Sequence, residues 1–183
     1  MGRYISVLAV VAVALAGCAD NSPPPAGPNP EPGGSVEQTP ANLLEPLVMS
    51  QKPAKAASVR DVMAMKDGEK VVVSGRTPTE KVKPFNAAVA AFVLMSPEDM
   101  DRDEVKEEFD CDDAATCPAC KQILEKYAVR VELVDQSGVV VPASLDGFRG
   151  IKPGGSITVE GEVKRDGKDK KTVRVVAKKF YPG

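Results

Sequence analysis

The last quarter of the chain carries the pattern that constrains the fold most. Residues 156–164 alternate apolar and polar side chains, which is the period of a strand with one buried face. Gly161 falls at an inward position of this pattern, where a barrel strand could bend. Residues 165–168 have the composition of a hairpin turn, and residues 172–180 supply the return strand. We therefore predict an antiparallel hairpin at the end of the chain.

Earlier segments supply the remaining strands and a helix. The residues expected to form strands are 70–77, 85–95, 127–135 and 139–143. Residues 85–95 are apolar almost throughout and fit a buried helix equally well; we assign a strand because the neighbouring segments are strands. Ser58, followed by an acid three positions later, predicts the start of a short helix. Together these elements predict a mainly β fold over residues 58–183, a small five-stranded antiparallel barrel with one or two short helices.

Residues 1–17 have the features of a bacterial lipoprotein signal peptide. Arg3 gives a short positive region, and the apolar stretch that follows is too short to span a bilayer. This stretch closes on Leu-Ala-Gly-Cys at residues 15–18, which resembles the lipobox, a motif in which the cysteine thiol receives a diacylglycerol. We therefore predict that Cys18 is lipidated and becomes the mature N-terminus. A retained membrane helix and a soluble secreted protein are the alternatives.

Lipidation would place the protein in the bacterial cell envelope, anchored to a membrane and facing the periplasm or the cell exterior. The membrane is then its expected partner. Residues 18–57 begin with a run rich in proline and glycine, which favours an extended, disordered tether between the anchor and the domain. A small apolar group late in this tether could dock on the domain; its members are Leu43, Leu44, Leu47 and Val48.

The composition narrows the chemistry. The chain has no histidine, which excludes Ser-His-Asp hydrolysis, histidine-ligated catalytic zinc and the histidine-containing haem attachment motif. Its formal net charge of -2 argues against a generally basic nucleic-acid binder. Aromatic residues are few and are expected mostly in the core, whereas nucleic-acid sites need exposed rings for stacking. We therefore do not expect nucleic acid as the partner.

Residues 96–126 form an acidic insertion that contains three of the four cysteines. Ser96, a following proline and an acidic first turn predict a helix at the start of the insertion. The run of acids over residues 98–113 is interpreted as a solvated helical segment. Three thiols within ten residues then follow, namely Cys111, Cys117 and Cys120. Because the acids repel one another, a crosslink or a cation is expected to close this loop.

The cysteine cluster has three interpretations. An oxidising envelope favours one disulfide with one spare thiol. Three thiolates could instead bind zinc together with an oxygen of Asp110, Asp112 or Asp113, although the usual fourth cysteine or histidine is missing. The Cys-Pro-Ala-Cys spacing of residues 117–120 also fits thiol redox chemistry, in which the first thiolate attacks and the second resolves. The sequence leaves these three open and indicates no cofactor other than zinc.

The order of these segments resembles the oligonucleotide/oligosaccharide-binding (OB) fold. The resemblance rests on residues 71–75, the cysteine-bearing insertion, residues 129–135 with a turn at Gly138, and residues 145–148 and 157–163. Over residues 58–183 the chain is similar to OB-like lipoproteins of environmental bacteria such as planctomycetes. The resemblance implies a barrel with a binding face, and it transfers no catalytic residues.

The sequence therefore predicts a lipid-anchored envelope protein whose OB-like barrel is a non-enzymatic binding or structural module. Thiol-redox or metal chemistry at the cysteine cluster is one alternative. Binding of nucleic acid or oligosaccharide on the barrel face is the other, and the basic side chains expected there are Lys168, Lys170, Lys171 and Arg174. The lysines equally fit a solvated strand edge that discourages aggregation.

Overall fold

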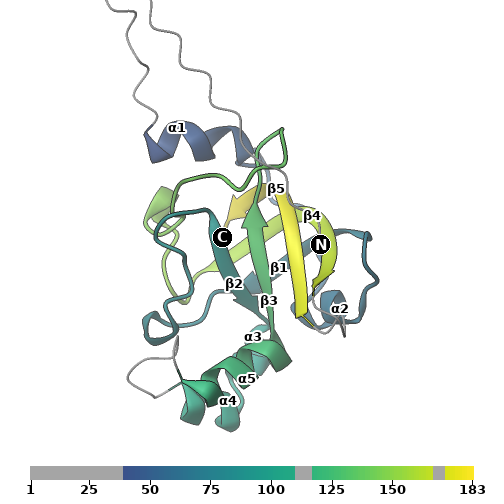
Figure 1. Ribbon diagram of the computed structural model, residues 1–183, viewed down its shortest axis with the longest axis vertical. Coiled ribbons are helices and arrows are strands. Elements are labelled where there is room, and N and C mark those ends of the chain that lie inside the picture. The colour runs from purple at the N-terminus through teal and green to yellow at the C-terminus, as the bar shows by residue number, and fades with distance from the viewer. Residues whose placement is uncertain (1–38, 110–116, 167–171) are drawn as a thin grey trace, which may run out of the picture. The chain divides into compact units, whose positions relative to one another are not determined.

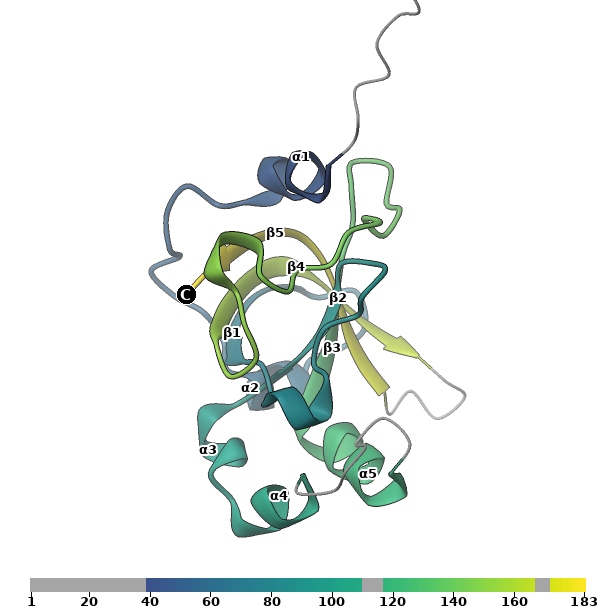
Figure 2. The same ribbon diagram turned by 90° about the vertical axis from the view of Figure 1, so that its left-hand side faces the viewer.

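A computed structural model describes residues 39–109, 117–166 and 172–183. Within them five strands curl into a closed barrel with the neighbour order β1-β2-β3-β5-β4, in which β4 closes on β1 (Figure 1, Figure 2). The strands are β1 Lys70–Arg76, β2 Ala91–Met95, β3 Ala128–Leu133, β4 Ser156–Asp166 and β5 Thr172–Pro182. The predicted fold class, a small five-stranded OB-like barrel, is confirmed.

One strand pair departs from the antiparallel arrangement that we predicted. β3 and β5 run parallel, with Arg130 opposite Arg174, whereas the other four neighbouring pairs are antiparallel. A closed ring with an odd number of strands cannot alternate direction all the way round. At least one parallel pair is therefore required, and it falls between β3 and β5, whereas β4 and β5 of the C-terminal hairpin are antiparallel.

Two of the predicted strands are shorter than the apolar segments that suggested them. Residues 139–143 contribute only one bridge, at Val140, and Pro142 has no N–H to donate to a ladder. Within residues 85–95 only the last five form β2. The side chain of Asn86 accepts hydrogen bonds from the backbone N–H groups two and three residues further on (2.8 and 3.2 Å), and this bends the chain before the strand begins.

The barrel interior is filled by aliphatic side chains. The alternation that we predicted in β3 and β4 holds for the apolar residues, which are buried. Of the residues between them Arg130 and Glu160 are exposed, whereas Glu132 and Thr158 are themselves buried. The fully buried side chains include Val73, Leu94, Val129, Val131, Leu133, Val159, Val163 and Val175. Each contributes on the order of 2 kcal/mol by its removal from water.

Short helices surround the barrel. α2 (Val59–Ala64) begins at Ser58 as predicted, and Ser58 and Asp61 each accept a hydrogen bond from the other's backbone N–H. The other helical segments are α1 Pro40–Leu44, η1 Glu45–Leu47, η2 Glu80–Val82, α3 Pro97–Met100, α4 Asp103–Glu108, α5 Pro118–Tyr127 and η3 Phe148–Gly150. Helices thus outnumber the one or two expected. In the ranges described, none has the length and apolar character needed to cross a bilayer.

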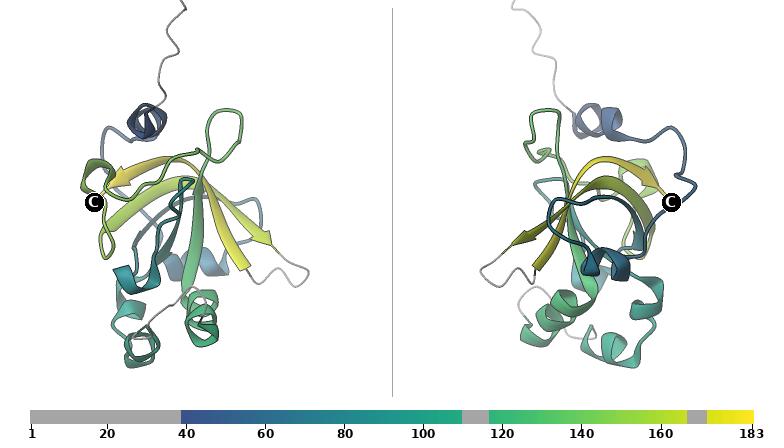
Figure 3. Two further views of the ribbon diagram at one scale, coloured as in Figure 1. Left: turned by 60° about the vertical axis from the view of Figure 1, so that its left-hand side comes forward. Right: turned by 90° about the vertical axis from the view of Figure 1, so that its right-hand side faces the viewer.

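The packed chain begins before residue 58. The predicted tether extends to residue 57, but the chain already lies on the barrel from α1 onward (Figure 3). Leu44 is fully buried and Leu47 nearly so, both in the core that fills the barrel. The apolar group late in the tether therefore docks, because burial of these side chains outweighs the ordering of a short segment. Residues 1–38, with the predicted signal peptide and Cys18, lie outside the described residues.

The insertion forms a second, smaller core at the end of the barrel away from α1 (Figure 1). α3, α4 and α5 bury Val105, Phe109 and Ile123 against Met95 at the end of β2. An ion pair ties this helical unit to the barrel, because Asp99 on α3 lies between arginine side chains. The solvated acidic helix that we predicted is thus two short helices with one buried carboxylate.

Candidate functional site

The outer surface of β2, β3 and β5 carries a row of charged side chains around Arg130. We call this surface the Arg130 face and define it by Lys83, Phe85, Arg130, Glu132 and Arg174. Arg130 projects outward from β3 with a side chain that is 58% exposed. Its parallel neighbour on β5 is Arg174, so the pairing of β3 with β5 sets two guanidinium groups side by side. Arg174 is the one predicted binding-face residue that the described ranges include.

Glu132 separates the two guanidinium groups. Its Oε1 lies 3.1 Å from Arg130 Nε, and its Oε2 lies 2.5 Å from Arg174 Nη1. The carboxylate side chain is only 12% exposed, so the ion pairs hold it in one orientation. One negative charge is thus shared between two positive charges. The face keeps an excess of positive charge at Arg130, the more exposed arginine.

A hollow of about 270 Å³ lies on one side of Arg130 and is lined by the loop before β2. Phe85 is half-buried there, and its ring centroid lies 6.1 Å from that of the buried Phe92. Lys83, which is exposed, adopts a left-handed backbone (φ 47°), a conformation that costs a lysine on the order of 1 kcal/mol. That turn folds residues 84–86 onto β2, where Val93 N donates to Pro84 O at 3.1 Å.

A second hollow, of about 130 Å³, lies on the same surface and shares Val93 and Arg130 with the first. Its other walls come from the end of α5 and the start of β5, including Leu124 and Thr172. Arg130 therefore stands between two depressions. The arrangement suits an elongated ligand that crosses the strands and presents an anionic group to the guanidinium.

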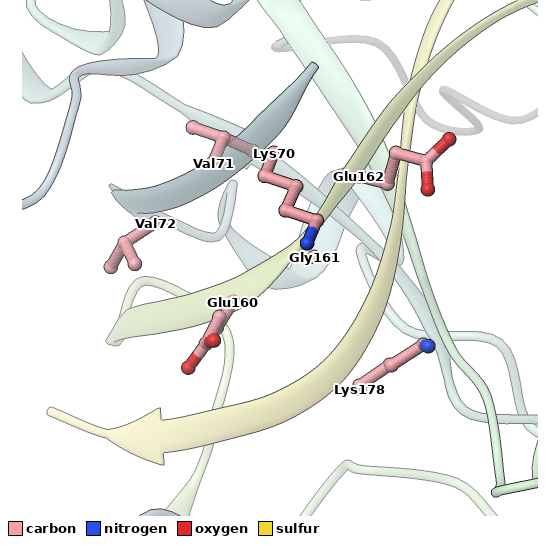
Figure 4. Close-up of a pocket in the computed structure, with 7 residues that line it drawn as sticks. All are labelled: Lys70, Val71, Val72, Glu160, Gly161, Glu162 and Lys178. Atoms are coloured by element: carbon pink, nitrogen blue, oxygen red, sulfur yellow. The ribbon is translucent and has the colours of Figure 1, made fainter. Parts of the chain in front are cut away.

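A separate charged hollow of about 330 Å³ opens on β1, β4 and β5 (Figure 4). Lys70, Glu160, Glu162 and Lys178 surround Gly161 in this view. Two ammonium groups and two carboxylates balance there. Glu162 also pairs with Lys164 and, by accepting its hydrogen bond, raises the pKa of that lysine above the ordinary value. The charges give this hollow no preference for a ligand of either sign.

The described part of the cysteine cluster is the start of α5. Cys117 is the N-cap residue of this helix and is partly exposed, whereas Cys120 is fully buried in the second core. Cys111, Asp110, Asp112 and Asp113 lie outside the described residues. Within the described ranges no disulfide forms and no group of three cysteine or acidic side chains could hold a metal ion. The three interpretations of the cluster stay predictions.

Other predicted site residues lie outside the described residues too, namely Lys168, Lys170 and Lys171. The sequence analysis missed Lys83, Phe85 and Arg130 as members of one surface. A partial signal was available, because the alternation in residues 127–135 places Arg130 and Glu132 on the polar side of the strand. Their meeting with Arg174 depends on the parallel pairing, which no local pattern encodes. Comparison of the sequence with protein-family models and with curated proteins finds no match.

Proposed function

We propose that this protein is a lipid-anchored component of the bacterial cell envelope whose barrel binds an elongated anionic ligand on the Arg130 face without enzymatic chemistry. The observation that carries the proposal is the half-exposed guanidinium of Arg130 between two hollows. The lipobox-like sequence that ends at Cys18 supports the location. Several acyl chains on one residue hold a protein stably on a membrane, whereas a single chain holds only marginally.

An acidic oligosaccharide is the ligand class that suits this face. Lys83, Arg130 and Arg174 outnumber the two nearby carboxylates, Glu132 and Glu125 of the second hollow, so carboxylate or phosphate groups on the ligand would be attracted. The half-buried ring of Phe85 offers one apolar surface for the C–H face of a sugar. Single-stranded nucleic acid needs several stacking rings in series, and this face supplies one.

The anchor is tested by replacing Cys18 with serine. We expect the wild-type protein to sediment with membranes and to carry acyl mass on Cys18, because the thiol is the atom that receives the lipid. The Cys18→Ser variant should lose the acyl mass completely, and it should either leave the membrane or keep its signal peptide. Intact-mass spectrometry of both proteins, after fractionation, checks this. A soluble wild-type protein with an unmodified Cys18 would contradict the anchor.

The Arg130 face is tested by binding to oligomers of galacturonic acid, with oligomers of glucose as the uncharged comparison. Arg130→Ala should weaken binding about tenfold, because a charge-assisted hydrogen bond contributes about 1.5 kcal/mol or more. Phe85→Ala should weaken it less. Arg130→Lys should recover only part of the loss, since an ammonium cannot bind a carboxylate through two parallel hydrogen bonds.

Lys121→Ala, at an exposed site on α5, is the control for charge loss away from the face. Titration calorimetry or a fluorescent oligomer gives the dissociation constants. If Arg130→Ala and Lys121→Ala change the constant equally, the face is not the site. Tighter binding of single-stranded DNA than of the acidic oligomers would move nucleic acid to first place.

Thiol chemistry is a second candidate function. The observation that favours it is the placement of Cys117 at the exposed start of α5, with Cys120 one turn further into the second core. Counting reactive thiols in the native and the denatured protein, with and without chelator, distinguishes a metal site from a disulfide. A metal site protects all three thiols of the cluster until chelator exposes them together, and a disulfide leaves one thiol titratable.

A further inference from the structure

A groove of about 680 Å³ lies beside the docked N-terminal segment. α1 and η1 form one wall, the turn after β3 forms another, and β5 contributes Lys178 and Lys179. Figure 1 and Figure 2 show α1 and this turn at the same end of the barrel. We call this surface the α1 end and define it by Leu43, Pro46, Val139, Lys178 and Lys179.

Apolar side chains are exposed at the α1 end. Val139 is 60% exposed and stands out among the large hydrophobic side chains of the described ranges. Its turn is held in place by Asp135, whose Oδ1 accepts hydrogen bonds from Ser137 N at 2.8 Å and from Val139 N at 3.0 Å. On the opposite wall Leu43 is partly exposed and Pro46 is exposed. A fixed turn thus presents an apolar tip next to a groove that combines apolar side chains of the N-terminal segment with the polar side chains of the turn, Asp135 among them.

Two lysines border the same groove because β5 contains a bulge. The register with β4 shifts between Glu160 and Gly161, so Lys178 and Lys179 are both exposed although they are consecutive. Lys179 Nζ donates to Pro46 O at 2.7 Å and so joins β5 to the N-terminal segment. Lys178 is exposed at the edge of the groove and forms no ion pair with any described residue, although it also lines the hollow of Figure 4 that contains Glu160 and Glu162. Apolar tips with basic side chains beside them suit the interface of an anionic bilayer.

The position of the chain argues for a membrane as the occupant. The described chain starts at Thr39, which caps α1 at this same end. Twenty residues, 19–38, separate it from Cys18, and they can span at most roughly 70 Å when fully extended. A connection of this length between an anchor and a domain gives an effective concentration of about a millimolar, so weak contacts are enough for docking.

We propose that the α1 end docks on the headgroups of an anionic phospholipid bilayer, with Lys178 on the lipid phosphates and Val139 in the interfacial layer. This inference rests on the proposed lipid anchor at Cys18. The net charge of -2 does not oppose it, because a lysine within a Debye length of the surface responds to the local potential. Docking in this way points α5 away from the bilayer (Figure 1).

Amine footprinting of the full-length lipidated protein tests the proposal. The protein is reconstituted in vesicles of phosphatidylcholine and phosphatidylglycerol mixed about two to one, and separately in phosphatidylcholine alone. We expect labelling of Lys178 to fall about fivefold in the anionic vesicles, the factor expected from one lysine near such a leaflet. Lys121 on α5 serves as the control and should label equally in both. High salt should restore the labelling of Lys178, since screening weakens the attraction.

Two variants sharpen the outcome. Val139→Asp places a carboxylate at the tip and should restore labelling of Lys178 in anionic vesicles, whereas Lys121→Glu should leave the protection unchanged. Equal labelling of Lys178 in both vesicles, with the protein still bound to them, would overturn the docking and leave the anchor intact. A protein without acyl mass that stays off both vesicles would overturn the anchor itself, and the docking with it. Protection of Lys178 from labelling to the same extent in both vesicle types would likewise overturn the role proposed for anionic lipid.

Discussion

Gly161→Ala is expected to lower the free energy of unfolding by about 3 kcal/mol. A Cβ atom at this position would lie 2.3 Å from Val176 O and 2.7 Å from Ala177 Cα. Both atoms belong to the backbone of β5, so no side chain can turn aside to make room. Relief requires β4 and β5 to separate at the bulge, and that breaks ladder hydrogen bonds next to the core.

Gly138→Ala is the matched control. Gly138 has a left-handed φ of 84°, but an added Cβ there meets no heavy atom within 4 Å. Gly138→Ala should therefore lower the free energy of unfolding by about 1 kcal/mol, from backbone conformation alone. The φ of Gly161 lies outside the left-handed range, so the destabilisation by Gly161→Ala comes from steric overlap with β5. Urea denaturation of the two variants compares these costs, and a loss at Gly161 no larger than that at Gly138 would contradict the close approach of β5.

The position of Gly161 shows what the sequence could predict about the fold. Alternation in residues 156–164 placed it inward, and a glycine at an inward position predicted a bend. The structure confirms the irregularity, which lies between Glu160 and Gly161. Strand alternation is a local pattern, so it is readable without knowledge of the partner strand. The bulge at Lys178 on β5 could not be located, because it depends on which residues face each other.

The charged contacts were harder to predict for the same reason. Arg130 and Glu132 could be assigned to the outer side of their strand, but Arg174 is 42 positions from Glu132 in the chain. Only the closure of the barrel, with its one parallel pair, brings them together. The sequence alone leaves the docking of Leu44 open, because short apolar groups also occur in unfolded linkers. In the structure this side chain is fully buried. Tertiary contact decides each of these cases.

Asp99→Asn is expected to lower the free energy of unfolding by about 3 kcal/mol near neutral pH. The Asp99 side chain is 1% exposed, and Arg60 donates to it from Nε at 2.8 Å and from Nη2 at 2.5 Å. Arg102 Nε donates to the same carboxylate at 2.8 Å. The amide can accept only part of these hydrogen bonds and carries no charge. Because Arg60 belongs to α2, its pairing with Asp99 on α3 joins the barrel to the helical insertion.

Asp101→Asn is the control for this substitution. Asp101 lies two residues further on, its side chain is 81% exposed, and its ion pair with Lys106 measures 3.7 Å. An exposed pair of this kind contributes about 0.5 kcal/mol or less. The ratio of the two losses, measured by urea denaturation, therefore separates the buried contact from a general effect of removing acidic charge. Equal losses would mean that the hydrogen bonds from Arg60 and Arg102 to Asp99 do not stabilise the fold.

The pH dependence gives a second measurement of the same contact. Hydrogen bonds from Arg60 hold the pKa of the Asp99 carboxyl below its ordinary value in the folded protein, against the opposing effect of its burial. The stabilising contribution is therefore fully present above the unfolded-state pKa of about 3.9 and is lost as the pH falls through the lower folded-state pKa. The difference in unfolding free energy between the wild type and Asp99→Asn should stay constant from neutral pH to about pH 5 and shrink below about pH 4. Curves that stay parallel through that range would show that the carboxylate charge contributes nothing, and the loss in Asp99→Asn would then come from altered packing between α2 and α3.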